Sequence, residues 1–157
     1  MATYAVGGNQ GTIGSSYKGS VATWCPSSNT KRHKWYEFIL GATTNPNPTD
    51  TYIQVDISRL SQTTSLAGTA FTPNPTDPAD GSALIVAAVN ITTEPSAAII
   101  SNSLFNVGLN QRATTRWIAA QESQYLIVPA TAVNGLYLRG QSSTYAGAFQ
   151  AQVSYLE

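Results

Sequence analysis

From Val21 onward, short runs of β-branched and aromatic residues alternate with turn-forming clusters at intervals of about ten positions. Within residues 52–57 the apolar side chains of Ile53, Val55 and Ile57 alternate with polar ones, which is typical of a strand that buries one face. We interpret further runs as strands at residues 21–24, 34–40, 65–71, 83–93, 104–109, 115–119, 125–128, 136–139 and 148–156. The pattern predicts an all-β fold.

Strands that are this short and this numerous fit two packed sheets. The predicted fold is therefore a single-domain antiparallel β-sandwich, jelly-roll-like, over residues 21–157. A chain of 157 residues has the size of one domain, and folding buries roughly 70% of the surface that the unfolded chain exposes. We expect the run 65–71 to pair with strand 52–57. The run Ala83–Val89 also suits two helical turns capped by Asp80, and we favour a strand there.

The first twenty residues differ in composition from the rest of the chain. Glycine recurs among Ser, Thr, Asn and Gln, and few side chains there are large enough to anchor a core. We therefore expect residues 1–20 to form a flexible N-terminal arm, either loose or ordered by a neighbouring subunit.

The charge composition excludes several classes of function. Charged residues make up only 10% of the chain, and eight Lys and Arg balance eight Asp and Glu. Because the chain carries no net positive charge that would attract phosphates, we do not expect nucleic acid as a partner. The chain also has no apolar run of the length that spans a bilayer, so we expect no membrane partner. Its single cysteine, Cys25, allows neither an intrachain disulfide nor a cysteine zinc site.

Few residues suggest catalysis. The only histidine, His33, lies between cations in the quartet Lys31–Lys34, and the sequence has no G-x-S-x-G nucleophile motif. We interpret the quartet as a solvated strand entrance whose cations meet carboxylates on a neighbouring loop or subunit. Asp77 and Asp80 are calcium-type ligands, but their spacing is not that of a calcium loop and Asx turns explain them. We expect no enzyme activity, no catalytic residues, no cofactor and no metal.

A five-residue segment occurs twice. Pro-Asn-Pro-Thr-Asp at residues 46–50 returns at residues 73–77, and the residues that follow the two copies differ. Proline denies a sheet its backbone donor, and Asn or Asp closes a turn through its own side chain. The identity therefore predicts two loops with the same turn chemistry, and not a duplicated structural unit.

Several ordered blocks together resemble a known family. These blocks are Lys34–Phe38, Asp77–Asp80, Asn90–Pro95, Leu109–Ala120, Leu126–Arg139, Tyr145–Gly147 and Val153–Glu157. Together, within residues 31–157, they resemble a family of small tailed-bacteriophage virion proteins encoded beside the major capsid protein. The resemblance implies a capsid decoration, or cement, protein that binds the outer shell as a trimer, and it offers no catalytic residues to carry over. The N-terminal arm of this chain is longer and richer in glycine than the family pattern.

The resemblance also implies partners and a location. The partners would be the major capsid protein and further copies of this chain, and the protein would be made in the host bacterial cytoplasm before it joins the capsid surface of the virion. We expect capsid or subunit contacts at Tyr4, Tyr17, Lys31, Arg32, Lys34, Asn47, Asn74 and Asp77. The alternative is a tail or head-fibre module that binds host glycans through surface aromatic rings.

Overall fold

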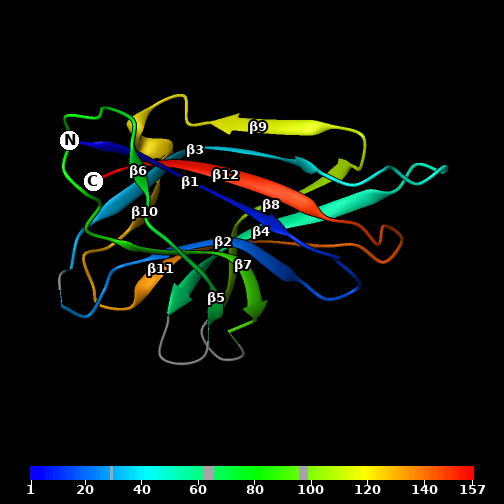
Figure 1. The fold of residues 1–157 in the computed structure, drawn as a ribbon, viewed down its shortest axis with the longest axis horizontal. Helices are drawn as coiled ribbons and strands as arrows, with labels where there is room; N and C mark the ends of the chain where they lie inside the picture. Colours follow the sequence, from blue (N-terminus) through cyan, green and yellow to red (C-terminus); the bar gives the residue numbers. More distant parts are fainter. Residues whose placement is uncertain (29, 62–65, 96–98) are drawn as a thin grey trace.

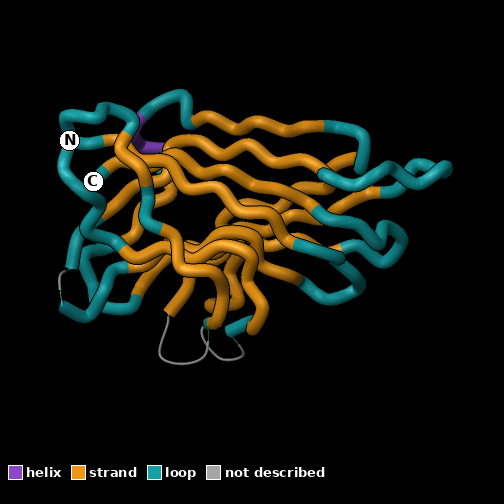
Figure 2. The backbone as a smooth tube through the Cα atoms, in the orientation of Figure 1, coloured by secondary structure: helices purple, strands orange, loops and turns teal. Residues whose placement is uncertain are grey.

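The computed structural model describes residues 1–28, 30–61, 66–95 and 99–157. It confirms the all-β prediction, because two antiparallel sheets pack face to face as a sandwich (Figures 1 and 2). Sheet A has the order β10-β3-β12-β1-β6, with β9 also paired to β3. Its strands are β1 (Thr3–Gln10), β3 (His33–Ala42), β6 (Asn74–Pro75), β9 (Thr114–Ile118), β10 (Leu126–Val128) and β12 (Phe149–Leu156).

Sheet B has the order β5-β7-β2-β11-β4-β8. Its strands are β2 (Lys18–Trp24), β4 (Tyr52–Ser61), β5 (Ala67–Phe71), β7 (Val86–Thr93), β8 (Ile99–Asn110) and β11 (Asn134–Gln141). The single helical element in the described ranges is the three-residue η1 (Glu122–Gln124), so no helix there has the length or the apolar character to cross a membrane.

The main core lies between the two sheets. Ile53, Val55 and Ile57 of β4 are fully buried there together with Trp35 and Phe38 of β3, which confirms the inward face predicted for residues 52–57. On the opposite face Asp56 is also buried, at 2% exposure, so this face is not solvated along its whole length as expected. A second, smaller apolar cluster is formed by Ala22, Leu60, Ala88, Ile91 and Tyr137.

A change in backbone conformation links the two clusters within β7. Asn90 has a φ of 52°, in the left-handed region that asparagine tolerates better than most residues. Val89 before it belongs to the main core, and Ile91 after it belongs to the second cluster. The Asn90 side chain accepts a hydrogen bond from the backbone N–H of Asn9 at 2.7 Å.

The predicted N-terminal arm is corrected by the structure. Residues 3–10 form β1, which lies between β12 and β6 in sheet A and pairs with β12 along its whole length, from Thr3 opposite Leu156 to Gln10 opposite Phe149. The reason lies in alternation that glycine hides: Tyr4 and Val6 are buried, and Gly8 continues this inward-facing series where a side chain would meet Ser20 and Val89. The sandwich therefore includes residues that we assigned to the arm.

The structure decides two further strand predictions. The run 65–71 begins at Ser65, outside the described residues, and its described part, β5, pairs with β7 and not with strand 52–57 as expected. The strand favoured within Ala83–Val89 is confirmed from Val86 onward, since β7 begins there.

Candidate binding surfaces

One predicted contact residue is in the core and not at the surface. Tyr4 is 3% exposed, stacks on Tyr155 and donates a hydrogen bond from its hydroxyl to the Gly81 carbonyl at 2.9 Å. Its placement follows from β1, which turns the Tyr4 ring inward. We therefore withdraw Tyr4 as a contact residue.

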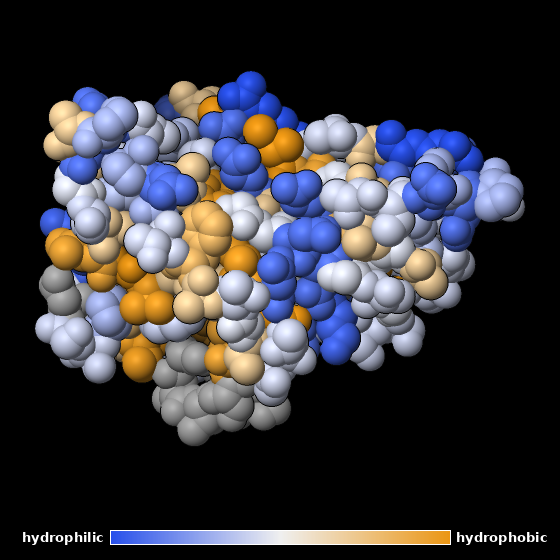
Figure 3. Space-filling model, in the orientation of Figure 1, coloured by the Kyte–Doolittle hydropathy of each residue, from blue (hydrophilic) through white to orange (hydrophobic). Residues whose placement is uncertain are grey.

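The other predicted contact residues do not form one site. The first Pro-Asn-Pro-Thr-Asp copy lies in the β3–β4 loop, at the tip farthest from the chain termini (right in Figure 1). There the Asn47 backbone N–H donates to Gln111 Oε1 at 2.9 Å, and Arg112 forms an ion pair with Asp50 at 2.8 Å. In the view of Figure 3 this tip is mostly hydrophilic to neutral, and apolar patches gather over the other half of the molecule.

The second copy lies near the termini. Asn74 belongs to the two-residue strand β6 and pairs with Ala5 of β1, and Asp77 accepts a hydrogen bond from the Ala79 N–H at 2.9 Å. Asp77 therefore closes an Asx turn, as its sequence predicts. The prediction of two loops is therefore confirmed for the first copy and wrong for the second, because Asn74 and Pro75 form β6 by pairing with β1.

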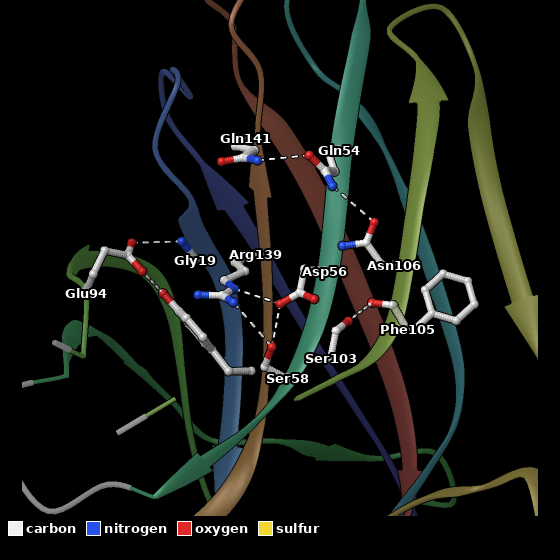
Figure 4. Close-up of polar contacts among 11 residues, drawn as sticks. Gly19, Gln54, Asp56, Ser58, Glu94, Ser103, Phe105, Asn106, Arg139 and Gln141 are labelled. Carbon is white, nitrogen blue, oxygen red and sulfur yellow. Dashed lines mark hydrogen bonds and ion pairs between the residues drawn. The ribbon is translucent and has the colours of Figure 1, made fainter. Parts of the chain in front are cut away.

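A polar network covers part of the outer face of sheet B (Figure 4). The carboxylate of Asp56 on β4 pairs with Arg139 on β11 at 2.7 Å and accepts a hydrogen bond from the Ser58 hydroxyl. The ring of Tyr17 lies 4.4 Å from the Arg139 guanidinium, a cation–π distance. The predicted contact residue Tyr17 is thus half-buried, and its ring packs on Arg139 of this network.

The same face carries an uncharged ladder above the ion pair (Figure 4). Gln141 donates to Gln54 at 2.9 Å, and Gln54 donates to Asn106 at 3.2 Å, so the amides join β11, β4 and β8. This arrangement fixes the direction of each amide and presents ordered hydrogen-bonding groups to solvent. It suits recognition of a polar surface.

The charge state of Asp56 follows from its surroundings. Burial acts to raise the pKa of the Asp56 carboxyl, but the hydroxyls of Ser103 and Ser58 and the Arg139 guanidinium outweigh burial and lower this pKa below its ordinary value. Asp56 therefore stays ionised and its charge is compensated locally by Arg139. Such a carboxylate is a poor general base.

The edge where β8 and β9 meet is apolar. We call the β8–β9 edge the surface formed by Leu104, Phe105, Trp117 and Ile118. Phe105 and Trp117 pack against the buried ring of Phe38 with centroid distances of 4.9 and 5.1 Å. Their chain neighbours are more exposed: Leu104 before Phe105 is 37% exposed, and Ile118 after Trp117 is 50% exposed.

Both strands of the β8–β9 edge have a free side. In the described part of the chain, β8 pairs only with β4 and β9 pairs only with β3. Exposed strand edges with apolar side chains are places where another chain adds or packs. The edge therefore combines free backbone groups with partly exposed apolar side chains.

The predicted run 104–109 covers the C-terminal half of β8 and the predicted run 115–119 overlaps β9, but the sequence analysis did not bring the two strands together. The signal for the edge was the short connection between these two runs, Asn110–Ala113, which holds a tight turn through the Ala113 N–H and the Asn110 carbonyl. What the sequence does not contain is that β8 and β9 belong to different sheets.

The basic quartet divides into exposed and buried members. Lys31 and Arg32 are exposed and Lys34 is half-buried, with its ammonium 5.8 Å from the centre of the Tyr125 ring. His33 is fully buried, so it does not belong to the solvated strand entrance that we expected. As the first residue of β3, it turns inward while Lys34 turns outward.

His33 lies in a closed environment. Its Nε2 shares a hydrogen bond with Thr23 Oγ1 at 2.9 Å, and Trp35 donates to the same hydroxyl at 2.9 Å. Burial lowers the pKa of His33 to about 4, so its imidazole is neutral at physiological pH. A buried histidine of this kind packs the core and contributes no charge to the basic surface around it.

An open pocket of about 620 Å³ lies beside the quartet, lined by Arg32, Arg59, Ile127, Pro129 and Ala130. Sequence reasoning named Arg32 and missed Arg59. The signal for Arg59 was its position, because it continues the inward-facing series of Ile53, Val55 and Ile57 on β4 with a charged side chain. No group of three or more His, Cys, Asp or Glu suited to a metal ion occurs among the described residues.

The fold and these surfaces define a β-sandwich with candidate binding sites at its edge, at its end and on one outer face. Comparison with known proteins gives no match to a family model, a curated protein or a solved structure.

Proposed function

We propose that this protein is a capsid decoration protein of a tailed bacteriophage, which binds the outer surface of the head shell as a homotrimer and stabilises it. The proposal is supported by the sequence resemblance over residues 31–157 and by the β-sandwich fold. The low content of charged residues is also suited to contacts made through shape and apolar area instead of electrostatic steering.

The observation that carries the proposal is the β8–β9 edge. A monomer that leaves Leu104 and Ile118 exposed beside two free strand edges keeps apolar surface in water, and association of copies removes it. A closed ring of subunits presents each binding surface several times, so modest contacts with a shell add up to tight attachment. We therefore assign subunit contacts to this edge.

The exposed loops are then free for the shell. Asn74 and Asp77 lie near the chain termini, on and just after β6, which pairs with β1. Asn47 is half-buried instead, and it is hydrogen-bonded to Gln111 in the turn between β8 and β9. Trimer formation through the edge leaves Asn74 and Asp77 available for the shell.

The experiment is a count of this chain relative to the major capsid protein in purified particles of the phage that encodes it. Quantitative mass spectrometry with labelled peptide standards supplies the ratio. A ratio near one copy per capsid subunit supports decoration of the shell. A handful of copies per particle places the protein elsewhere in the virion, and its absence from particles overturns the proposal.

A second candidate is a head-fibre or tail module that binds host glycans. It is favoured by one observation: the half-exposed rings of Tyr36 and Tyr125 lie 6.4 Å apart, next to the Lys34 ammonium. Sugar rings stack on aromatic faces of this kind. Saturable binding of host-surface glycans that is lost in Tyr125→Ala, together with a low copy number, would favour this function over decoration.

A further inference from the structure

Arg59 occupies an unusual position for a cation. It follows Ile53, Val55 and Ile57 on the inward-facing side of β4, and its guanidinium donates a hydrogen bond across the sandwich to the Ile127 carbonyl on β10 at 2.8 Å. This bond holds one arm of the guanidinium. An arginine has five N–H donors in a planar fork, so further donors remain for a ligand.

The chain supplies no carboxylate to this arginine. All eight Asp and Glu residues lie in the described ranges, and the ion pairs there join Arg112 to Asp50, Arg116 to Glu37 and Arg139 to Asp56. Arg32 and Arg59 enter none of them. The neutral, buried His33 adds no charge nearby, so the pocket is lined by two arginines that have no acidic partner among the described residues.

The lining of the pocket indicates what kind of anion fits. Beside the two arginines it is lined by Ile127, Pro129 and Ala130, which are apolar residues. A volume of about 620 Å³ is within the range of small-ligand sites. Guanidinium forks match the two oxygens of a carboxylate, and the apolar wall matches an aliphatic group next to it.

We propose that this pocket binds a carboxylate carried on an apolar stem, such as the C-terminal residue of a polypeptide. Inorganic phosphate offers the same oxyanion chemistry but nothing for the apolar wall. The inference rests on Arg32 and Arg59 and not on the β8–β9 edge, so it holds or fails independently of the function proposed above.

The test is a titration of the full-length protein with three probes: N-acetyl-leucine, N-acetyl-leucinamide and inorganic phosphate. NMR follows the arginine Nε–Hε signals, with Arg112 and Arg116 as internal references. We expect saturable shifts of the Arg32 and Arg59 signals with N-acetyl-leucine. The amide should bind at least about tenfold more weakly, since it lacks the charge-assisted hydrogen bonds, and phosphate should also bind more weakly.

Two variants assign the binding to the pocket. Arg32→Gln removes one fork at an exposed position and should weaken N-acetyl-leucine binding about tenfold, and Arg59→Lys keeps the charge but removes the planar fork. Arg116→Gln, a matched change in a surface ion pair, should leave binding unchanged. Equal binding of acid and amide, tighter binding of phosphate, or loss of binding in Arg116→Gln but not in Arg32→Gln overturns the proposal.

Discussion

Arg139 and Asp56 lie directly opposite each other on β11 and β4, and their side chains form an ion pair at 2.7 Å on the outer face of sheet B. The Asp56 side chain is 3% exposed and that of Arg139 is 20% exposed. The pair also anchors the ring of Tyr17, which lies on the Arg139 guanidinium. One cross-strand contact therefore joins β4, β11 and the loop before β2.

Loss of Arg139 should be costly because it leaves the Asp56 charge buried without its partner. We expect Arg139→Ala to lower the free energy of unfolding by about 3 kcal/mol. The control is Arg116→Ala, whose side chain is 59% exposed in its pair with Glu37 and which should lose less than about 1 kcal/mol. Urea unfolding followed by fluorescence measures both. Equal effects of the two substitutions would contradict the role assigned to Arg139.

His33 should make stability depend on pH. Its pKa is about 4 in the folded protein against 6.5 ordinarily, so the unfolded chain binds a proton more readily between these values. The stabilisation is complete above pH 6.5 and is lost as the pH falls toward 4, with a slope of at most about 1.4 kcal/mol per pH unit. Urea unfolding at several pH values from 7.5 to about 4.5, above the range in which Asp56 titrates, measures this slope.

The control for this slope is His33→Gln, which keeps a hydrogen-bonding side chain but cannot take up the proton. The variant should show a shallower fall in the free energy of unfolding between the same pH values, whatever its stability at pH 7.5. A variant with the wild-type slope would mean that another group is responsible.

Gly8 should resist substitution because β1 packs closely on sheet B there. A Cβ at Gly8 would clash with the Ser20 carbonyl and lie 2.8 Å from Val89 Cβ, whereas a Cβ at Gly7 would have its nearest neighbour at 3.8 Å. We expect Gly8→Ala to cost about 1 to 3 kcal/mol and to lower the melting temperature by about 3 to 10 °C. Gly7→Ala should change it little. Calorimetry on both variants tests this, and similar melting temperatures would argue against β1 as an inner strand.

The β8–β9 edge should control association. Ile118→Lys or Leu104→Lys would place a charge in the subunit contact, and each should raise the dissociation constant of the oligomer at least tenfold, by a rough estimate, while the melting temperature of the subunit stays similar. Leu84→Lys is the matched control, because Leu84 is 45% exposed but lies outside the edge. Sedimentation velocity measures the oligomer. If only Leu84→Lys dissociates the oligomer, the subunit contact lies outside the β8–β9 edge.

Local sequence patterns determined much of this fold. The alternation of Ile53, Val55 and Ile57 predicted a half-buried strand because side chains of a strand point to opposite faces in turn, and the structure buries all three. Turn residues likewise placed the loop at residues 46–50. Both features depend on neighbours in the chain, so the sequence contains them.

The tertiary structure decided what depends on distant residues. Residues 3–10 became an inner strand because Gly8 admits the backbone of β2 and the side chain of Val89, a fit that no local pattern of glycines reveals. The pairing of Asp56 with Arg139, 83 positions apart, and the meeting of Arg32 with Arg59 at one pocket arise from strand order. Strand order is set by long-range packing between the sheets, and the alternation within each strand is the same for many possible orders.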